Sequence, residues 1–279
     1  MTLLEVLQSS TEYFKKRKID NARLNAEHLL AHVLGRKRIE LYLEFERALD
    51  ESELAPLRDL VRRRGEGEPL QHLLGTVEFC GNVFKIDKRG MVPRPETEEL
   101  VELLNAEGGR RKAETILDVG TGSGVIALSL AAKFPDAQVR AIDISEDALA
   151  LAAENAERLG LTARVQFRKG NLLEGISETF DLIAANLPYI AMQDRQSLAR
   201  EVLHDPEVAL FGGEGGDEII RELIAQAPTR LQPNGLLALE IGLGQAEPLV
   251  ELLAQKNFHD IETKQDYQSL PRFLFARYG

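Results

Sequence analysis

Apolar positions follow two different patterns along the chain, and the pattern changes near residue 65. Before that point they recur at helical spacing, as in the run 22–34, and glycine is rare. Gly35 is expected to end that helix, and the spacing predicts another helix over 52–64. Residues 1–74 are therefore predicted to form a small all-α domain.

Two short strand-like runs follow, TVEFC and VFKID, and Gly81-Asn82 separates them. A Gly-Asn pair between two such runs predicts a hairpin with a two-residue turn. We therefore expect residues 75–90 to form a β-hairpin that links two domains.

From about residue 91 onward, strand patterns alternate with helix patterns. Strands are predicted over 115–119, 138–144, 164–170, 180–190 and 235–242, and helices over 124–134, 146–160, 215–231 and 246–258. This alternation predicts an α/β fold for 91–279, with a mostly parallel sheet and helices on both faces. The last two runs, 261–267 and 272–278, lie too close together for a crossover helix and are expected to close the sheet as an antiparallel pair.

Composition narrows the class of protein. Hydrophobic residues make up 44% and charged residues 28%, as in ordinary globular proteins. No apolar stretch is long enough for a membrane helix and no signal peptide is recognisable, so we expect a cytoplasmic protein with no membrane partner. Cys80 is the single cysteine, which excludes a disulfide within the chain and a cysteine-rich zinc site. No metal site is predicted.

Residues 1–75 contain equal numbers of acidic and basic residues, so the net charge of −11 comes entirely from residues 76–279. A strongly acidic protein cannot neutralise many phosphates, so stable direct binding to nucleic acid is not expected.

A glycine-rich loop between a strand and a helix is the first candidate site. The sequence Asp118-Val119-Gly120-Thr121-Gly122-Ser123-Gly124 follows the predicted strand 115–119 and opens the next helix. Glycines there let the backbone approach a ligand closely. Asp143 ends the following strand, where a carboxylate can accept hydrogen bonds from both hydroxyls of a ribose. The loop and the strand end thus predict that Asp118, Gly120, Thr121, Gly122, Ser123, Gly124 and Asp143 bind a cofactor.

The spacing of the loop indicates which nucleoside it binds. The dinucleotide fingerprint is G-x-G-x-x-G, whereas this chain has G-x-G-x-G with Asp118 two residues before the first glycine. An acid at that position suits a cationic ligand without phosphate. S-adenosylmethionine, with its sulfonium and amino groups, fits this description.

The second candidate site is Asn186-Leu187-Pro188-Tyr189, at the end of the predicted strand 180–190. The Asn186 side-chain oxygen and the Leu187 main-chain carbonyl can accept both hydrogens of an NH2 group. Pro188 restrains Leu187 to an extended shape, and Tyr189 can lie flat against a planar amide or base. Such acceptors favour a nitrogen with an available lone pair and stabilise the positive charge that it gains during methyl transfer.

Several blocks of the sequence together resemble the bacterial release factor glutamine methyltransferases, the HemK/PrmC family. The resemblance covers nearly the whole chain. It rests on EPLQHLLGTVEFCGNVFKID, MVPRPETEELVE, ILDVGTGSGVIALSLA, AIDISEDALALAAENA, NLPY, PEVALFGGEGG, LALEIGLGQ and RFLFAR.

The resemblance implies a class I methyltransferase domain with a seven-stranded, Rossmann-like sheet and a C-terminal antiparallel strand. It implies methyl transfer to the glutamine of the Gly-Gly-Gln motif of release factors, which would modulate translation termination. It places the methionine part of the cofactor at Gly120 to Gly124, the ribose at Asp143, the adenine at Asn171 and the glutamine at Asn186 to Tyr189. With it, Ile144, Asn171, Leu172 and Asn186 are added to the predicted cofactor-binding residues. It also implies that the helical domain recognises the protein substrate. We expect a monomer, because a protein substrate needs an open cleft.

Two positions depart from the family pattern. Leu187 replaces the proline of the usual Asn-Pro-Pro-Tyr, and Asn171 replaces an acid. Leucine keeps the main-chain carbonyl, and the Asn171 amide oxygen can still accept a hydrogen bond from adenine. The PRPETE segment can wall the acceptor site, so Arg94, Pro95 and Glu96 are predicted to contact the substrate. The alternatives are methylation of adenine in nucleic acid, methylation of glutamine in another protein, and a scaffold that binds the cofactor without catalysis.

Overall fold

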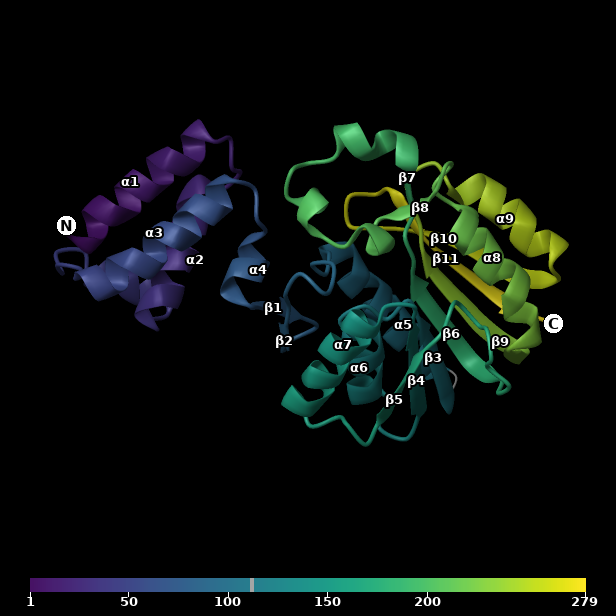
Figure 1. Ribbon diagram of the computed structural model, residues 1–279. Helices are drawn as coiled ribbons and strands as arrows, with labels where there is room; N and C mark the ends of the chain where they lie inside the picture. The colour runs from purple at the N-terminus through teal and green to yellow at the C-terminus, as the bar shows by residue number, and fades with distance from the viewer. Residues whose placement is uncertain (111–112) are drawn as a thin grey trace. The chain divides into compact units, whose positions relative to one another are not determined.

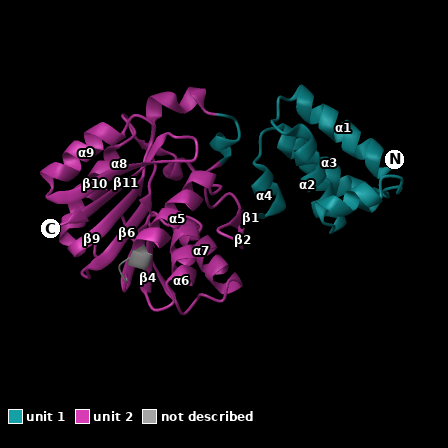
Figure 2. Cartoon of the chain, turned by 180° about the vertical axis from the view of Figure 1, so that it is seen from behind, with its two compact units in different colours: residues 1–76, 199–204 teal, residues 77–198, 205–279 magenta. Residues whose placement is uncertain are grey.

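The computed structural model describes residues 1–110 and 113–279, and the chain divides into two compact units. Unit 1 comprises Met1–Thr76 together with Ala199–His204, and unit 2 comprises Val77–Leu198 and Asp205–Gly279 (Figure 2). The sequence gives no sign that a short segment near residue 200 belongs with the helical unit. Within the described residues, no helix is both long enough and apolar enough to cross a membrane.

Unit 1 is built from helices whose ends follow local sequence signals. Thr2 and Glu5 form a reciprocal capping box at the start of the first helix, and Asp50 and Glu53 do the same for the third. Gly35 ends the second helix in a left-handed conformation. The helices are α1 (Leu3–Lys16), α2 (Ala22–Leu34), η1 (Arg38–Leu43), α3 (Glu51–Gly65) and α4 (Leu70–Leu74). Their core consists mainly of leucines, to which every one of these helices contributes, together with Phe14.

A two-stranded hairpin follows, with β1 (Thr76–Phe79) and β2 (Asn82–Lys85), and all of it except Thr76 belongs to unit 2. Its turn residues are Cys80 and Gly81, one position earlier than the predicted Gly81-Asn82. Both have positive φ, 48° and 75°, which is the conformation that a tight hairpin turn requires. Asn82 begins the second strand, and its amide donates to the Cys80 carbonyl at 3.3 Å.

The main sheet has seven strands in the order β10-β11-β9-β6-β3-β4-β5 (Figure 1). Strand β11 runs antiparallel to both of its neighbours, and the other pairs are parallel. The predicted sheet with its antiparallel strand near the C-terminus is thus confirmed. The strands are β3 (Thr115–Val119), β4 (Gln138–Asp143), β5 (Val165–Lys169), β6 (Phe180–Asn186), β9 (Leu231–Glu240), β10 (Phe258–Gln265) and β11 (Pro271–Tyr278).

Helices cover both faces of this sheet because its strands are apolar on both sides. Ile116 packs with α5 (Pro95–Arg110) and α6 (Val125–Lys133), whereas the next residue, Leu117, packs with α8 (Glu218–Gln226) and α9 (Ala246–Gln255). Helix α7 (Glu146–Arg158) contacts β4 and β5.

The predicted helix over 215–231 is wrong at its C-terminal end. Helix α8 stops at Gln226, a 3-10 turn η5 (Ala227–Thr229) contains Pro228, and β9 already begins at Leu231. Proline cannot continue the backbone hydrogen bonding of a helix, so the chain leaves the helical conformation here.

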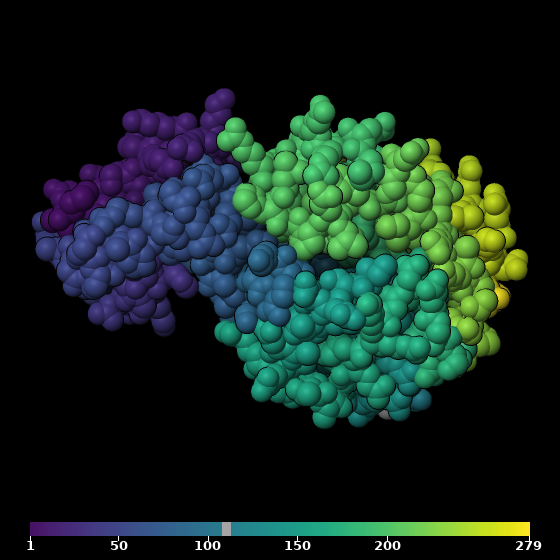
Figure 3. All heavy atoms as spheres, viewed as in Figure 1, coloured from purple at the N-terminus to yellow at the C-terminus, as the bar shows by residue number. Residues whose placement is uncertain are grey.

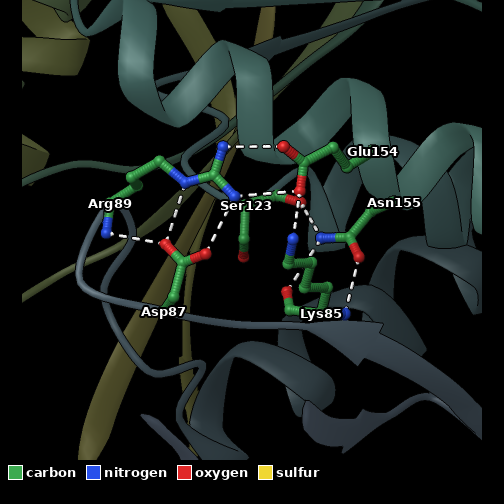
Figure 4. Close-up of polar contacts among 6 residues, drawn as sticks. All are labelled: Lys85, Asp87, Arg89, Ser123, Glu154 and Asn155. Atoms are coloured by element: carbon green, nitrogen blue, oxygen red, sulfur yellow. Dashed lines mark hydrogen bonds and ion pairs between the residues drawn. The ribbon is translucent and has the colours of Figure 1, made fainter. Parts of the chain in front are cut away.

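A polar network fastens the hairpin to the sheet domain (Figure 4). The Arg89 guanidinium lies between Asp87 and Glu154, and each of its four hydrogen bonds to them is 2.8 or 2.9 Å long. Asn155 is fully buried, accepts from the Lys85 N–H at 2.6 Å and donates to the Lys85 carbonyl at 3.0 Å. The same Asn155 amide donates to the Ser123 carbonyl at 2.9 Å, so one side chain supports both β2 and the glycine loop.

Candidate active site

The glycine loop connects β3 to α6 and is held by the neighbouring strand. The N–H groups of Gly120 and Thr121 both donate to the Ile142 carbonyl, at 2.8 and 2.9 Å. Gly122 has φ of 56°, and a Cβ placed there would meet no protein atom within 4 Å. This residue therefore presents bare backbone to an open cavity, as close contact with a ligand requires.

Asp143 ends β4, and its side chain is hydrogen-bonded to the glycine loop. One carboxylate oxygen accepts from the Gly122 N–H and the other from the Ser145 N–H, both at 2.8 Å. Each oxygen keeps further acceptor capacity, and the residue lines the cavity. Burial raises the pKa of Asp143, while the two backbone bonds oppose that shift. The carboxylate is thus fixed in place with lone pairs left for a ligand.

Asp118 is predicted to bind the cofactor, but the structure places it away from the cavity surface. It is completely buried and is not among the residues that line the cavity. One oxygen accepts from the Thr121 hydroxyl at 2.6 Å and from the Ala127 N–H at 3.0 Å, so it joins the glycine loop to the start of α6. The other oxygen has no hydrogen-bond partner among the described residues. Burial raises the pKa of Asp118 to about 7.

One cavity brings the two candidate sites together. Its lining includes the loop residues Gly120 to Ser123, the strand-end residues Asp143 and Ile144, the pair Asn171 and Leu172, and the first three residues of the Asn186 tetrad. All of these residues belong to unit 2. The surface of unit 2 is hollowed between its teal part and its light-green part (Figure 3). Gly124 and Tyr189 are predicted site residues that do not line the cavity.

The tetrad is fixed from several sides. A Cβ on Gly120 would lie 2.7 Å from Leu187 Cδ2, so the leucine packs directly on the glycine loop. The Gln245 amide donates to the Tyr189 carbonyl at 3.0 Å. Burial, with the negative charge of Glu240 nearby, raises the pKa of the Tyr189 hydroxyl to about 12. Tyr189 therefore stays neutral.

A second glycine-rich segment, 212–216, supports the backbone of the tetrad. Strand β7 (Ile190–Ala191) pairs with β8 (Phe211–Gly213). A Cβ on Gly212 would lie 2.4 Å from the Pro188 carbonyl oxygen, and one on Gly216 would lie 2.7 Å from the Tyr189 carbonyl oxygen. Glycine is required here because the two segments lie so close together. Glu218 accepts from the N–H groups of Gly215 and Gly216, so this segment is anchored.

The PRPETE segment reaches the cavity through other residues than those predicted. Pro93 and Thr97 of this segment line it, as does Met91 just before the segment, whereas Arg94, Pro95 and Glu96 do not. Arg94 instead pairs with Asp205 at 2.9 Å. Pro95 is the exposed first residue of α5, followed by Glu96.

Sequence reasoning missed two buried residues beside the tetrad, Thr97 and Glu240. Glu240 ends β9 directly opposite Asn186 in the parallel register, and it lies in the LALEIGLGQ block. An acid at the end of a buried strand is the signal that points to it. Among the described residues, no cluster of histidines, cysteines or acids is arranged to hold a metal ion.

A glycine loop between the first strand and helix of a seven-stranded sheet with this strand order defines a class I methyltransferase. Residues 110–269 match the family described as "Methyltransferase domain", and residues 5–75 match "PrmC N-terminal domain". Ribosomal protein L11 methylase from Lactobacillus delbrueckii is similar in structure, with 26% identity and a TM-score of 0.52 over 70% of this chain and 84% of that one.

Full-length relatives define the family more narrowly. A protein of Geobacter sulfurreducens named release factor glutamine methyltransferase is 42% identical, over 100% of this chain and 97% of its own length. A protein of the same name from Rhodopirellula baltica is 41% identical, over 86% of this chain and 83% of its own length. The chain belongs to the release factor glutamine methyltransferase family.

Proposed function

We propose that this protein transfers a methyl group from S-adenosylmethionine to the side-chain amide nitrogen of the glutamine in the Gly-Gly-Gln motif of peptide chain release factors. Family membership supports the reaction. The observation that carries it is the placement of Asn186 in the same cavity as the glycine loop and Asp143. A cofactor cradle and an amide acceptor site thus share one space.

The residues of the cradle fit S-adenosylmethionine. Gly122 leaves open space where a side chain would stand, and Asp143 offers fixed carboxylate oxygens for ribose hydroxyls. The aliphatic Ile144 side chain is 51% exposed although it lines the cavity, which suits the face of an adenine ring. The Asn171 amide can accept from the adenine amino group. The bound cofactor supplies an electrophilic methyl group on a sulfonium.

The tetrad holds the acceptor. Asn186 Oδ1 and the Leu187 carbonyl oxygen take the two hydrogens of the glutamine NH2 group, and Pro188 keeps Leu187 extended. Conjugation with its carbonyl makes an amide nitrogen a poor nucleophile. Two acceptors that bind both hydrogens favour a pyramidal nitrogen and stabilise the positive charge that it gains. Holding the nitrogen in line with the methyl group supplies much of the remaining rate enhancement.

The remaining assignments concern the partner and its setting. The helical domain, residues 1–74, recognises the release factor, the 75–90 hairpin links the domains, and residues 91–279 perform the transfer. Arg94, Pro95 and Glu96 lie beside cavity-lining residues and contact the substrate at the rim. The enzyme acts as a cytoplasmic monomer without stable nucleic-acid binding, in keeping with its net charge of −11.

Methyl transfer from radiolabelled S-adenosylmethionine to a purified release factor tests this function. The matched control is the same release factor with its Gly-Gly-Gln glutamine changed to alanine. Label on the first protein and none on the second is the expected result. Equal labelling of both would move the acceptor to another residue, and no label on either would contradict the proposed substrate.

A further inference from the structure

Three polar side chains form a buried chain behind the acceptor site. Asn186 Nδ2 donates to Thr97 Oγ1 at 2.9 Å, and the Thr97 hydroxyl donates to Glu240 Oε2 at 2.8 Å. Thr97 and Glu240 are only 2% and 1% exposed. They come from α5 and the end of β9, so two separate elements converge on one side chain of β6.

The number of protons in this chain fixes the direction of each hydrogen bond. A threonine hydroxyl has one proton to donate, and an ionised carboxylate can only accept. The Thr97 proton therefore goes to Glu240, and Thr97 can only accept from Asn186. That bond uses the Asn186 NH2 group and leaves Oδ1, the oxygen that an acceptor amide requires, on the opposite side of the carboxamide.

We propose that Thr97 and Glu240 are positioning residues that orient the Asn186 carboxamide for the acceptor, and that protonation of Glu240 removes this orientation. This inference rests on the proposed function. A protonated Glu240 can donate to Thr97 Oγ1, and the Thr97 proton is then free to bind Asn186 Oδ1. The carboxamide turns over, and its NH2 group faces the NH2 group of the substrate. Two donors facing one another cannot bind.

The groups around Glu240 set the pH at which it gains its proton, and that pH is near neutral. Burial raises the pKa of Glu240 to about 7, and the charge of Glu96 on α5 acts in the same direction. The Thr97 hydroxyl, the Arg272 guanidinium on β11 and the Tyr189 hydroxyl, 3.4 Å from Oε1, oppose the shift. Ionised Glu240, the form that orients Asn186, therefore predominates only above about pH 7.

Substitution of Thr97 tests the relay without changing any charge. Thr97→Val keeps the shape but removes the hydroxyl, and Thr97→Ser keeps the hydroxyl. We expect kcat for release factor methylation to fall about 10- to 100-fold in the valine variant, as for loss of a hydrogen bond to a charge-bearing centre. The serine variant should stay within about threefold of wild type. The Kd values for S-adenosylmethionine and for the release factor should change little in both, because neither depends mainly on Asn186.

Glu240→Gln tests the pH dependence. The wild-type rate should fall as the pH drops below about 7, with the loss of ionised Glu240. The glutamine side chain has no proton to gain, and its carbonyl oxygen can still accept from Thr97, so the variant should lack this acid limb. Asp118 also titrates near pH 7, so a limb due to Asp118 would remain in the variant.

Two results would overturn the relay. One is a valine variant with wild-type kcat, and the other is an acid limb of unchanged position and steepness in Glu240→Gln. If the glutamine variant does not fold, as judged by circular dichroism, the threonine pair decides alone. Absence of transfer by wild type at every pH would instead overturn the proposed function, and the relay with it.

Discussion

Two buried carboxylates, Asp118 and Glu240, stand on either side of the strand that ends at Asn186. Burial raises the pKa of both to about 7, yet they act through different partners. Asp118 joins the glycine loop to α6, and Glu240 holds the threonine behind the acceptor site. We thus propose a structural use for Asp118 and a chemical use for Glu240.

Replacing Asp118 by asparagine should change how stability depends on pH. The folded protein keeps this proton up to about pH 7, whereas an unfolded aspartate loses it near its usual value of 3.8. The contribution of Asp118 to the wild-type free energy of unfolding therefore falls as pH rises from about 4 to 7, by at most about 1.4 kcal/mol per pH unit, and levels off above that. Asp118→Asn lacks this contribution. Urea denaturation at several pH values gives the free energy of unfolding of both proteins. If the two plots of this free energy against pH were parallel, the raised pKa of Asp118 would be refuted.

Gly122→Ala should remove cofactor binding while the fold remains. The added Cβ would project into the open cavity, in a residue with φ of 56°. Gly35 in unit 1 is a matched control, since its φ is 60° and a Cβ there also meets nothing within 4 Å. Both variants should lose about 1 kcal/mol of stability from backbone strain.

Only Gly122→Ala should raise the Kd for S-adenosylmethionine, by at least about tenfold, since the cavity loses space that the ligand fills. Isothermal titration calorimetry measures this Kd. Equal Kd values for the two variants would argue against a cofactor at this loop.

At the scale of elements, the tetrad depends on the β7–β8 pair and on segment 212–216. Gly212→Ala would bring a Cβ within 2.4 Å of the Pro188 carbonyl oxygen and 2.1 Å of the Gly216 carbonyl oxygen. We expect the tetrad backbone to move and kcat to fall about 100-fold, because even a displacement of about 1 Å costs that much at a catalytic site.

The control for this substitution is Gly215→Ala, where the nearest atom to a Cβ is a Glu218 oxygen at 3.4 Å. Activity should stay near wild type in this variant. The Kd for the cofactor should be unchanged in both variants. An active Gly212→Ala enzyme would mean that segment 212–216 does not position the tetrad.

Elements with a strong local pattern were predictable, and elements fixed by distant partners were not. The strand 115–119 and the helix that follows it come directly from hydrophobic periodicity and the glycines between them. The strands β7 and β8 are too short to show an alternation of apolar and polar residues, and each is a strand only because it pairs with the other. The hairpin turn was predicted one residue late, since Cys80, an unusual residue for positive φ, occupies its first position.

The same distinction explains what the sequence could say about the site. Asp143 and Asn186 stand at strand ends, where topology alone brings them to one edge of the sheet. Thr97 and Glu240 are 143 residues apart, and no local pattern connects them. The same holds for Arg94, which pairs with Asp205 at 2.9 Å although 111 residues of sequence separate them.

For the whole molecule, the division into units depends on long-range contacts as well. Arg64 on α3 has a side chain only 5% exposed, and it pairs with Glu201 at 2.7 Å across 137 residues of sequence. It also donates to Asn25 Oδ1 at 2.7 Å. The segment Ala199–His204 therefore belongs to unit 1, although the chain on both sides of it belongs to unit 2. Buried polar pairs of this kind produce no regular pattern in a sequence, so the sequence does not predict them.

The central claim is that one cavity in unit 2 holds the methyl donor and the acceptor amide, with Asn186 as the group that binds the acceptor. Substituting Asn186 by alanine tests it most directly, with the exposed Asn105→Ala on α5 as the control. The Kd for S-adenosylmethionine and the rate of methyl transfer to a release factor are measured for both variants.

We predict that Asn186→Ala binds the cofactor within about threefold of wild type but transfers methyl at least about 100-fold more slowly, as expected for loss of a group needed in the transition state. Asn105→Ala should match wild type in both measurements. A fully active Asn186→Ala enzyme would contradict this account of the active site.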